Sequence, residues 1–443
     1  MPGWMHSITA KVLGVAALAL LMLIPLGSIQ SMVGERQELN AQAAGNVAKG
    51  WGGRQVVGGL MLAVPAEQTV LDANQRQVIT RSTEFVLADR MATSATMSIE
   101  RRRYGMYEVP VYVADVSFVG HVDAADVATF RQASGRSWLG AKAELRLPVA
   151  DLQGLRDVGD VRVNGKQVRL VSSTARAGGL PVVSVPIDLD ALAGQSIDFT
   201  VRIKLAGTGS LQFLPMARTG TVDLQAPWPD PSFVGASLPV SRRVDDRGFQ
   251  AQWRVLDLNR DYGQHWNEGD ANVDTRMAAS AFGVELFQPG SVYQQNDRAG
   301  KYALLFIAMT FVVFFLYEVL QRLRVHPVQY LLVGAAMVVF YVLLLALSEQ
   351  LGFALAYLMA ALAVVGIIAG YASAVLRARR AGWTLGVVLG LLYAVLYGLI
   401  GAEQYALLIG AVVLLAVVAL LMYLTRHIDW YTQGSTRMNR ETP

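Results

Sequence analysis

The sequence predicts a membrane α-helical bundle of six spans, with a large, mainly β, sandwich-like domain inserted between the first and second spans. Five apolar runs in the last third of the chain each approach the length of about 20 residues that crosses a bilayer. A further apolar run lies near the start, at residues 12–29. The chain between them alternates apolar and polar residues and contains no run of membrane length, which indicates strands outside the membrane.

The last five spans are expected at residues 302–320, 328–347, 353–376, 383–400 and 404–424. No water is available inside a bilayer, so each span must satisfy its own backbone hydrogen bonds as a helix. The gaps after the first and third of these runs are rich in arginine, whereas the other two contain Glu349 and Glu403. Because basic residues are retained on the cytoplasmic side, the basic gaps and the C-terminal tail are predicted to be cytoplasmic.

The composition excludes several classes of protein. The chain is 53% hydrophobic and 16% charged, with a mean hydropathy of +0.37, which is typical of a membrane protein. The excess of base behind its net charge of +4 lies in the predicted cytoplasmic turns and tail, so we expect a lipid bilayer and no nucleic acid as a partner. The absence of cysteine excludes disulfides, thiolate metal ligands and a cysteine nucleophile.

The first apolar run is predicted to be a retained membrane anchor. It is longer than the core of a usual signal peptide, and the nearest small-x-small site, Ala41-Gln42-Ala43, lies too far downstream for cleavage. A cleaved signal peptide is the alternative. Pro25 is expected to kink or end the helix near its outer end. Its short basic start lies inside, so the anchor delivers the chain to the periplasm and leaves both termini in the cytoplasm.

Four parts follow along the chain. They are an N-terminal membrane anchor at residues 1–33, a periplasmic β-rich domain at 34–298, a five-helix transmembrane bundle at 299–427 and a cytoplasmic tail at 428–443. Within the periplasmic domain, a short helix is expected at residues 38–49, where the following glycines end it. Segments such as 108–114 and 199–205 then alternate as strands with one buried face do. Asn164-Gly165 between two such segments predicts a hairpin turn in antiparallel, sandwich-like sheets.

One segment of this domain is a candidate interaction site. Residues 227–235 contain three prolines, which force an extended backbone and remove ladder donors, so the segment cannot be a central strand. It also carries Trp228 and Phe233, and a rigid aromatic loop could recognise a partner. The alternative is that the two rings fill the end of the hydrophobic core, as aromatic side chains commonly do.

The search for catalytic and metal-binding motifs is negative, so the protein is predicted not to be an enzyme and to hold no cofactor or metal. The five histidines are scattered and form no pair at helical spacing. No Gly-x-Ser-x-Gly elbow occurs, and residues 159–167 lack the spacing of a phosphate-binding loop. Asp245 and Asp246 lie among arginines, which favours solvated surface pairs over acid–base chemistry.

Small residues at four-residue spacing mark a helix contact inside the bundle. Gly382, Gly386 and Gly390 form one ridge, and Gly366 with Gly370 forms another on the preceding span. Such ridges let helix backbones approach closely, and packing of this kind drives helix association in lipid. We therefore expect the two consecutive spans to pack through their glycines. A dimer seam is the alternative.

The few ionisable side chains of the bundle lie toward the ends of its spans. Glu318 is expected near the cytoplasmic end, with Arg322 one turn on. Lys301 and Glu349 are expected at the outer face, where we predict an ion pair between them. The alternative is that Glu349 is an interfacial charge that contacts lipid headgroups. A transporter would be expected to place such groups near the midplane.

Several segments resemble the CreD family of inner-membrane proteins. They lie at residues 286–293, 297–302, 326–334, 340–349 and 428–431, with looser matches at 107–112 and 228–235 in the soluble half. The resemblance implies a Gram-negative inner-membrane protein under the control of the CreB–CreC two-component system. It also implies a stress-response role in cell envelope integrity and in tolerance of colicins or cell-wall antibiotics. It implies no reaction.

The sequence therefore favours a non-enzymatic envelope-integrity protein whose periplasmic domain binds an envelope protein or a cell-wall or lipid component. The alternative is a transporter or channel for a small solute or lipid, which would need a polar cavity near the midplane. An enzyme ranks third because no catalytic constellation is found. The sequence carries no signal for the oligomeric state.

Overall fold

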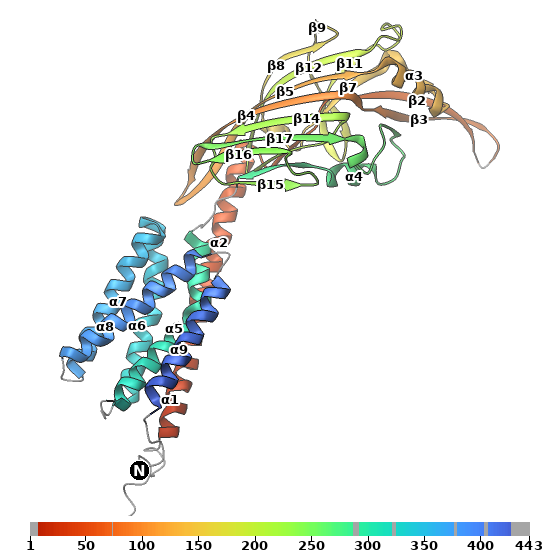
Figure 1. Cartoon of the computed structure of the whole chain (residues 1–443). Coiled ribbons are helices and arrows are strands. Elements are labelled where there is room, and N and C mark those ends of the chain that lie inside the picture. Colours follow the sequence, from red (N-terminus) through yellow and green to blue (C-terminus); the bar gives the residue numbers. More distant parts are fainter. Residues whose placement is uncertain are drawn as a thin grey trace, which may run out of the picture. The chain divides into compact units, whose positions relative to one another are not determined.

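The structure, a computed structural model, describes residues 8–72, 74–286, 292–320, 325–375, 379–402 and 406–426. The chain divides into two compact units (Figure 1). The helical unit comprises Met1–Leu39 and Gly290–Pro443, and the β unit comprises Asn40–Pro289. Each unit has its own hydrophobic core.

The helical unit is built from long apolar helices. They are α1 (Ile8–Leu21), α2 (Leu23–Trp51), α5 (Val292–Leu320), α6 (Pro327–Leu351), α7 (Phe353–Val375), α8 (Arg379–Gly401) and α9 (Ala406–Thr425). Among the described residues, five segments are long and apolar enough to cross a membrane, with α1 and α2 counted as one. In α9, the sixth predicted span, the apolar stretch found among the described residues is the shorter Leu408–Ala419. The large β unit lies between the first and second spans, as expected.

The N-terminal anchor and the short helix predicted after it are joined. Helix α1 ends at Leu21, and α2 begins at Leu23 and continues through Pro25 to Trp51. Pro25 lacks an N–H, and its ring crowds the carbonyl of the residue four positions earlier, which is Leu21. This explains why the helix is interrupted there, one turn before the position at which a kink was expected. Gly52 then ends α2 with a φ of 124°, a conformation that glycine adopts readily.

The N-terminal helices belong to the core of the helical unit. Ala19, Met22, Leu26 and Ile29 are buried in the same cluster as residues of α5 to α8. This packing is compatible with a retained anchor, which stays a prediction. Beside it, Phe340 and the tyrosines at positions 341, 357 and 393 pack edge to face, which joins α6, α7 and α8.

The predicted glycine contact is correct for two of the five glycines and wrong for the other three. A side chain at Gly382 would lie 2.6 Å from the backbone oxygen of Ala369, and one at Gly386 would lie 3.1 Å from the Ala369 Cβ. Helix α8 therefore approaches α7 through these two glycines. In contrast, Gly366, Gly370 and Gly390 have open space around them. On α7, the small residues Ala369 and Ser373 take the place of the expected glycine ridge.

The β unit contains two further helices, α3 (Ala124–Ser134) and α4 (Val273–Ala279), and three sheets. Its strands are β1 (Gln55–Val57), β2 (Met61–Leu71), β3 (Gln77–Val86), β4 (Ala88–Tyr104), β5 (Tyr107–Val122), β6 (Ser137–Trp138), β7 (Ala143–Pro148), β8 (Leu155–Val163), β9 (Lys166–Gln167), β10 (Val171–Ala177), β11 (Leu180–Ile187), β12 (Ile197–Thr208), β13 (Ser210–Phe213), β14 (Ala217–Ala226), β15 (Pro231–Gly235), β16 (Ser241–Asp245), β17 (Gly248–Leu256), β18 (His265–Asn267) and β19 (Phe282–Leu286).

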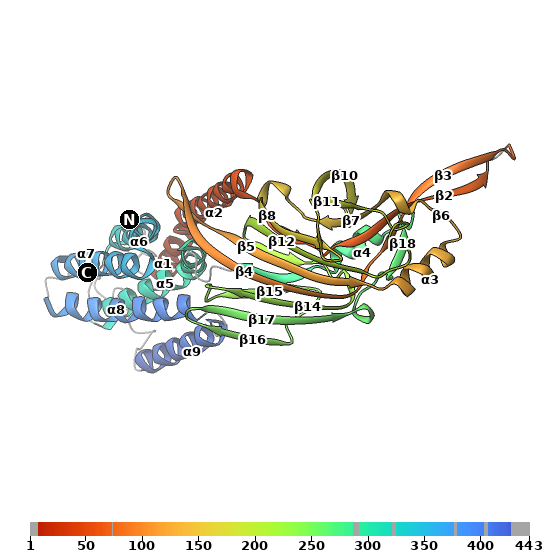
Figure 2. The same ribbon diagram turned by 90° about the horizontal axis from the view of Figure 1, so that it is seen from above.

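Within the described residues, the sheets have four, seven and eight strands. Their orders are β1-β13-β19-β15, then β10-β11-β7-β2-β3-β18 with β6 beside β2, and β16-β17-β14-β4-β5-β12-β8-β9. Figure 2 shows the long strands β4 and β5, around which the largest sheet is organised. Most pairings are antiparallel, although β1 with β13 and β14 with β4 run parallel. The sandwich packing of the sheets stays a prediction.

Two local expectations for the β unit are confirmed. Asn164 and Gly165 connect β8 to β9 with φ values of 48° and 76°, as a tight hairpin turn requires. Strand β15, which begins at Pro231 within the proline-rich segment, lies at the edge of its sheet, where a missing N–H costs no ladder hydrogen bond. One continuous core contains residues from all three sheets, among them Phe213, Leu145 and Phe118.

The glycine contact predicts a difference between two substitutions on one helix. Gly382→Ala should destabilise the bundle by about 1–3 kcal/mol, because the added methyl group would overlap the backbone of α7. Gly390→Ala, eight residues on, should be tolerated, since nothing lies within 4 Å of the added atom. Thermal unfolding of the full chain in detergent measures both. Equal unfolding midpoints for the two variants would show that α7 and α8 do not meet at Gly382.

Candidate functional site

Two buried carboxylates are the strongest candidates for functional groups, one in each unit. Glu318 of α5 is 3% exposed and Glu84 of β3 is 0% exposed. A carboxylate removed from water must be paired and hydrogen-bonded, or it becomes protonated. The partners of these two groups therefore indicate what each site can do.

Glu318 collects partners from distant parts of the helical unit. Lys11 of α1 forms an ion pair with its Oε1 atom. The backbone N–H of Val325 donates to the same oxygen over 2.8 Å, and the Tyr330 hydroxyl donates to Oε2 over 2.9 Å. Both carboxylate oxygens thus have donors, and the charge is balanced by a lysine. This arrangement fastens α1 to α5 and to the start of α6.

A small recess lies beside Glu318, between α5, α6 and α7. It is lined mainly by apolar side chains, including Phe314 and Val333, with Glu318, Gln329 and Tyr371 as polar members. Intramembrane carboxylates that face a recess commonly serve an ion or substrate pathway. Here the carboxylate is fully paired, so a ligand in the recess would have to displace Lys11 to bind it.

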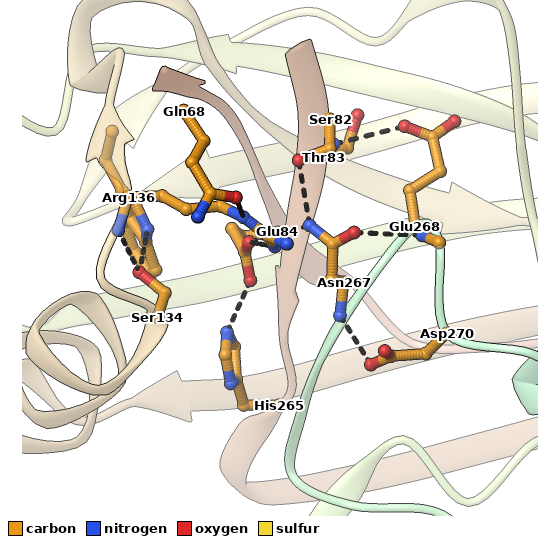
Figure 3. Close-up of polar contacts among 12 residues, drawn as sticks. Gln68, Ser82, Thr83, Glu84, Ser134, Arg136, His265, Asn267, Glu268 and Asp270 are labelled. Carbon is orange, nitrogen blue, oxygen red and sulfur yellow. Dashed lines mark hydrogen bonds and ion pairs between the residues drawn. The ribbon is translucent and has the colours of Figure 1, made fainter. Parts of the chain in front are cut away.

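Glu84 is the centre of a polar network in the seven-stranded sheet (Figure 3). Asn267 of β18 donates to its Oε1 atom over 2.7 Å, and Arg136 forms an ion pair with the same atom. His265 Nε2 lies 2.7 Å from its Oε2 atom. The ring of His265 in turn stacks on Phe130 of α3, with their centroids 5.0 Å apart. Helix α3 is thereby held against the sheet.

The network also extends to a side-chain amide and a hydroxyl around it. Arg136 donates through Nε to Gln68 over 3.2 Å, and Asn267 donates to Ser82 over 2.9 Å. Arg136 follows Gly135, which ends α3 with a φ of 62° and turns the chain toward Glu84. Glu84 Oε1 accepts from Arg136 and Asn267, and Oε2 lies against His265, so its neighbours enclose the carboxylate. The geometry suits an internal structural network better than a catalytic group.

Sequence reasoning missed both networks. Glu84 precedes Phe85 and Val86 in a strand whose alternation is weak, so it resembles a solvent-facing charge. His265 stood among the scattered histidines, and it lies 181 positions from Glu84. Glu318 was noted, but its expected neighbour Arg322 lies outside the described residues. The sequence feature that could have indicated the Glu318 network is Lys11, a charged residue directly before the apolar run at residues 12–29.

The two aromatic candidates lie in the core. Trp228 is 6% exposed and donates through Nε1 to the Asp230 carbonyl over 3.1 Å. Phe233 is half-buried on β15 and makes edge contacts with Phe249 and Trp253. The rings therefore fill the core, which is the alternative that the sequence left open, and they do not form an exposed recognition loop.

The predicted ion pair between Lys301 and Glu349 does not form. Lys301 pairs with Asp297 one turn earlier on α5, over 2.6 Å. Glu349 lies 3.6 Å from Arg36 of α2 and also accepts from the Tyr293 hydroxyl over 3.3 Å. The error has a physical cause: a lysine at a helix surface reaches a carboxylate one turn away at little entropic cost. Glu349 instead pairs with a basic side chain of α2, Arg36.

Metal binding finds no support among the described residues, in which no group of three or more His, Asp or Glu side chains is suitably placed for an ion. One buried hydroxyl in the β unit does show a strong environmental effect. Burial raises the pKa of Tyr112 well above its ordinary value. It stays protonated and donates to the Ser210 carbonyl over 2.6 Å, which is a structural role.

The Lys11–Glu318 pair predicts an unequal cost for two lysine substitutions. Lys11→Met should destabilise the full chain by about 2–4 kcal/mol, since it leaves the Glu318 carboxylate buried without its counter-ion. Lys301→Met should cost less than about 0.5 kcal/mol, because that lysine is exposed and pairs only within its own helix. Unfolding in detergent provides the comparison. A Lys11→Met variant as stable as Lys301→Met would contradict the pairing.

Comparison with known proteins identifies the family. The family described as Inner membrane protein CreD matches residues 7–431. The chain is also 32% identical over 424 residues to Inner membrane protein CreD of Escherichia coli (strain K12), which covers 95% of this chain and 93% of that protein. The two buried networks and the paired helices described above lie within the matched region. The chain belongs to the CreD family of inner membrane proteins.

Proposed function

We propose that this protein maintains the integrity of the cell envelope under stress, as a non-enzymatic protein whose β unit faces the periplasm and binds another envelope component. Membership of an inner-membrane family and the apolar helices support the location. In the proposed topology α9 completes a sixth span, and both termini are cytoplasmic. The arginine-rich gaps between the spans support that orientation.

One observation carries the proposal that the helices serve as an anchor. No Asp, Glu, Lys or Arg occurs within residues 302–317, 328–348, 353–375, 381–401 or 406–425. Ion- and proton-coupled transporters place charged groups near the middle of the bilayer. The charge closest to the interior, on Glu318, is balanced by Lys11. A bundle with this distribution is suited to hold a domain in the membrane.

The β unit offers a surface on which a partner could bind. Strands β2 and β3 extend beyond the rest of their sheet (Figure 2). Beyond Glu67, β2 pairs only with β3 among the described strands. This projecting part carries Leu71 and Ile79, which are 65% and 61% exposed. Exposed apolar side chains that gather on a projection favour contact with another molecule.

The alternative function is a transporter or channel for a small solute or lipid. The recess beside Glu318 favours it, because a carboxylate in that lining could contact a cationic group. Cargo binding would then require Glu318 to exchange Lys11 for the cargo.

The topology is tested by single cysteines, since the chain has none of its own. A membrane-impermeant maleimide should label Leu258→Cys in cells with a permeabilised outer membrane, because Leu258 is 87% exposed on the β unit. Arg426→Cys, after α9, should react only once the inner membrane is opened. Labelling of both sites in cells with an intact inner membrane would contradict the six-span arrangement.

The binding role is tested by the projecting strands. Ile79→Asp should abolish the tolerance of envelope stress that the unaltered chain restores to cells lacking their own copy, because it places a charge on the proposed contact surface. Leu258→Asp, at an even more exposed apolar position elsewhere on the β unit, should restore tolerance fully. Both variants should reach the same abundance in the inner membrane. Full tolerance with Ile79→Asp would show that this surface is not needed for the function.

A further inference from the structure

Strand β16 forms an open edge of the largest sheet. It pairs with β17 on one side, and it has no second neighbour among the described strands. All five of its residues are exposed. Val244 within it is 45% exposed, and Val240 just before it is 69% exposed. Open edges with exposed apolar side chains are ready templates for another strand.

The charges of this edge have an unusual order. The sequence Arg242-Arg243-Val244-Asp245-Asp246 carries two positive residues, one apolar residue and two negative residues. If a second, antiparallel copy is centred on Val244, Arg243 lies opposite the partner's Asp245, and Arg242 lies toward the partner's β16–β17 turn, which carries Asp246. The charges within the strand then face their opposites, and Val244 faces its own equivalent. Opposite charges directly across an antiparallel pair stabilise it.

Other pairings of the same two strands are unfavourable. Centring the pair on Arg243 would place that arginine opposite itself, and a parallel, in-register pair would align like charges along the whole edge. Like charges directly opposite each other destabilise a strand pair. The charge order therefore selects a single register, which is the property that a specific contact needs.

The side chains of this edge are placed for such a contact. The guanidinium of Arg242 lies 5.8 Å from the centroid of the Phe233 ring, which limits its freedom. Arg243 and Asp246 have no ion-pair partner within the described part of the chain. Asp245 accepts only from the backbone N–H of Arg247, over 2.9 Å, and this leaves its carboxylate open to a further donor.

We propose that β16 is a homodimerisation edge, at which a second copy of this chain adds its own β16 in antiparallel register about Val244. The two eight-stranded sheets then join across a two-fold axis, and the same surface of each copy forms the contact, as in most homodimers. The contact is short. Both copies are confined to one membrane by their helices, and confinement raises the effective concentration of the second copy.

A symmetric disulfide tests the register. Val244→Cys introduces a single cysteine into a chain that has none. Cross-strand neighbours at the axis lie about 4.5–5.5 Å apart, within disulfide reach after a small adjustment. Mild oxidation of membranes should convert this full-length variant to a covalent dimer. Leu258→Cys, which is more exposed, should stay monomeric. Equal dimer yields from the two variants, or a Val244→Cys adduct with a different protein, would overturn the proposal.

Charge exchange tests the pairing independently of disulfide chemistry. In the Val244→Cys background, Arg243→Asp or Asp245→Arg alone places like charges opposite each other twice, and each should lower the rate of dimer formation by about tenfold. The two changes together restore opposite charges in both places and should recover the original rate. Because the double variant carries both substitutions, its recovery excludes misfolding as the cause of the single losses. If the double variant is as slow as the single variants, the charges of β16 only protect an open edge, and no dimer forms there.

Discussion

A charge that is taken out of water must keep a partner, and this requirement determines much of the helical unit. Glu318 is buried near one end of α5, and Lys11 of the N-terminal helix supplies its counter-ion. Loss of one partner from a buried ion pair destabilises a protein by several kcal/mol. Apolar contacts between helices in lipid, in contrast, favour no particular helix as the neighbour. The pair therefore specifies where α1 packs. The hydrogen bonds that Tyr330 and the backbone N–H of Val325 donate to Glu318 fix the position of the start of α6 in the same way.

The β unit applies the same requirement without a bilayer. Glu84 lies inside a sheet and is satisfied by Arg136, which follows α3, and by His265 and Asn267, which both belong to β18. The network ties α3 and β18 to the sheet. The binding that we propose uses the surfaces of the unit, namely the projecting end of β2 and β3 and the open edge at β16, and it needs no catalytic residue.

Much of the fold could be predicted from sequence, because hydrophobic period and turn chemistry are local. The apolar runs predicted the positions of the spans closely, and Asn164-Gly165 predicted the two residues of a hairpin turn. Long-range partners could not be found in this way. Lys11 and Glu318 are 307 positions apart, and no local pattern connects them. Lys301 was assigned to Glu349 because both were expected at the outer ends of adjacent spans, yet Lys301 has Asp297 one turn away and Glu349 has Arg36 of α2 within reach. Gly366 and Gly370 show the same limit, since spacing alone does not reveal which face of a helix meets its neighbour.

The central claim is that the helices hold the β unit in the membrane and carry no cargo. It is tested most directly by removing the buried charges while keeping their hydrogen bonds. The variant Lys11→Met with Glu318→Gln eliminates both charges. The glutamine oxygen can accept from the Val325 N–H, and its amide NH2 can donate to the Tyr330 hydroxyl, which reverses the direction of that hydrogen bond. Tolerance of envelope stress is then measured in cells that contain this variant as their only copy. Unchanged tolerance at unchanged abundance in the membrane is expected. A well-folded, abundant variant without tolerance would show that Glu318 binds a transported ion or solute, and would contradict the proposed role of the helices as an anchor.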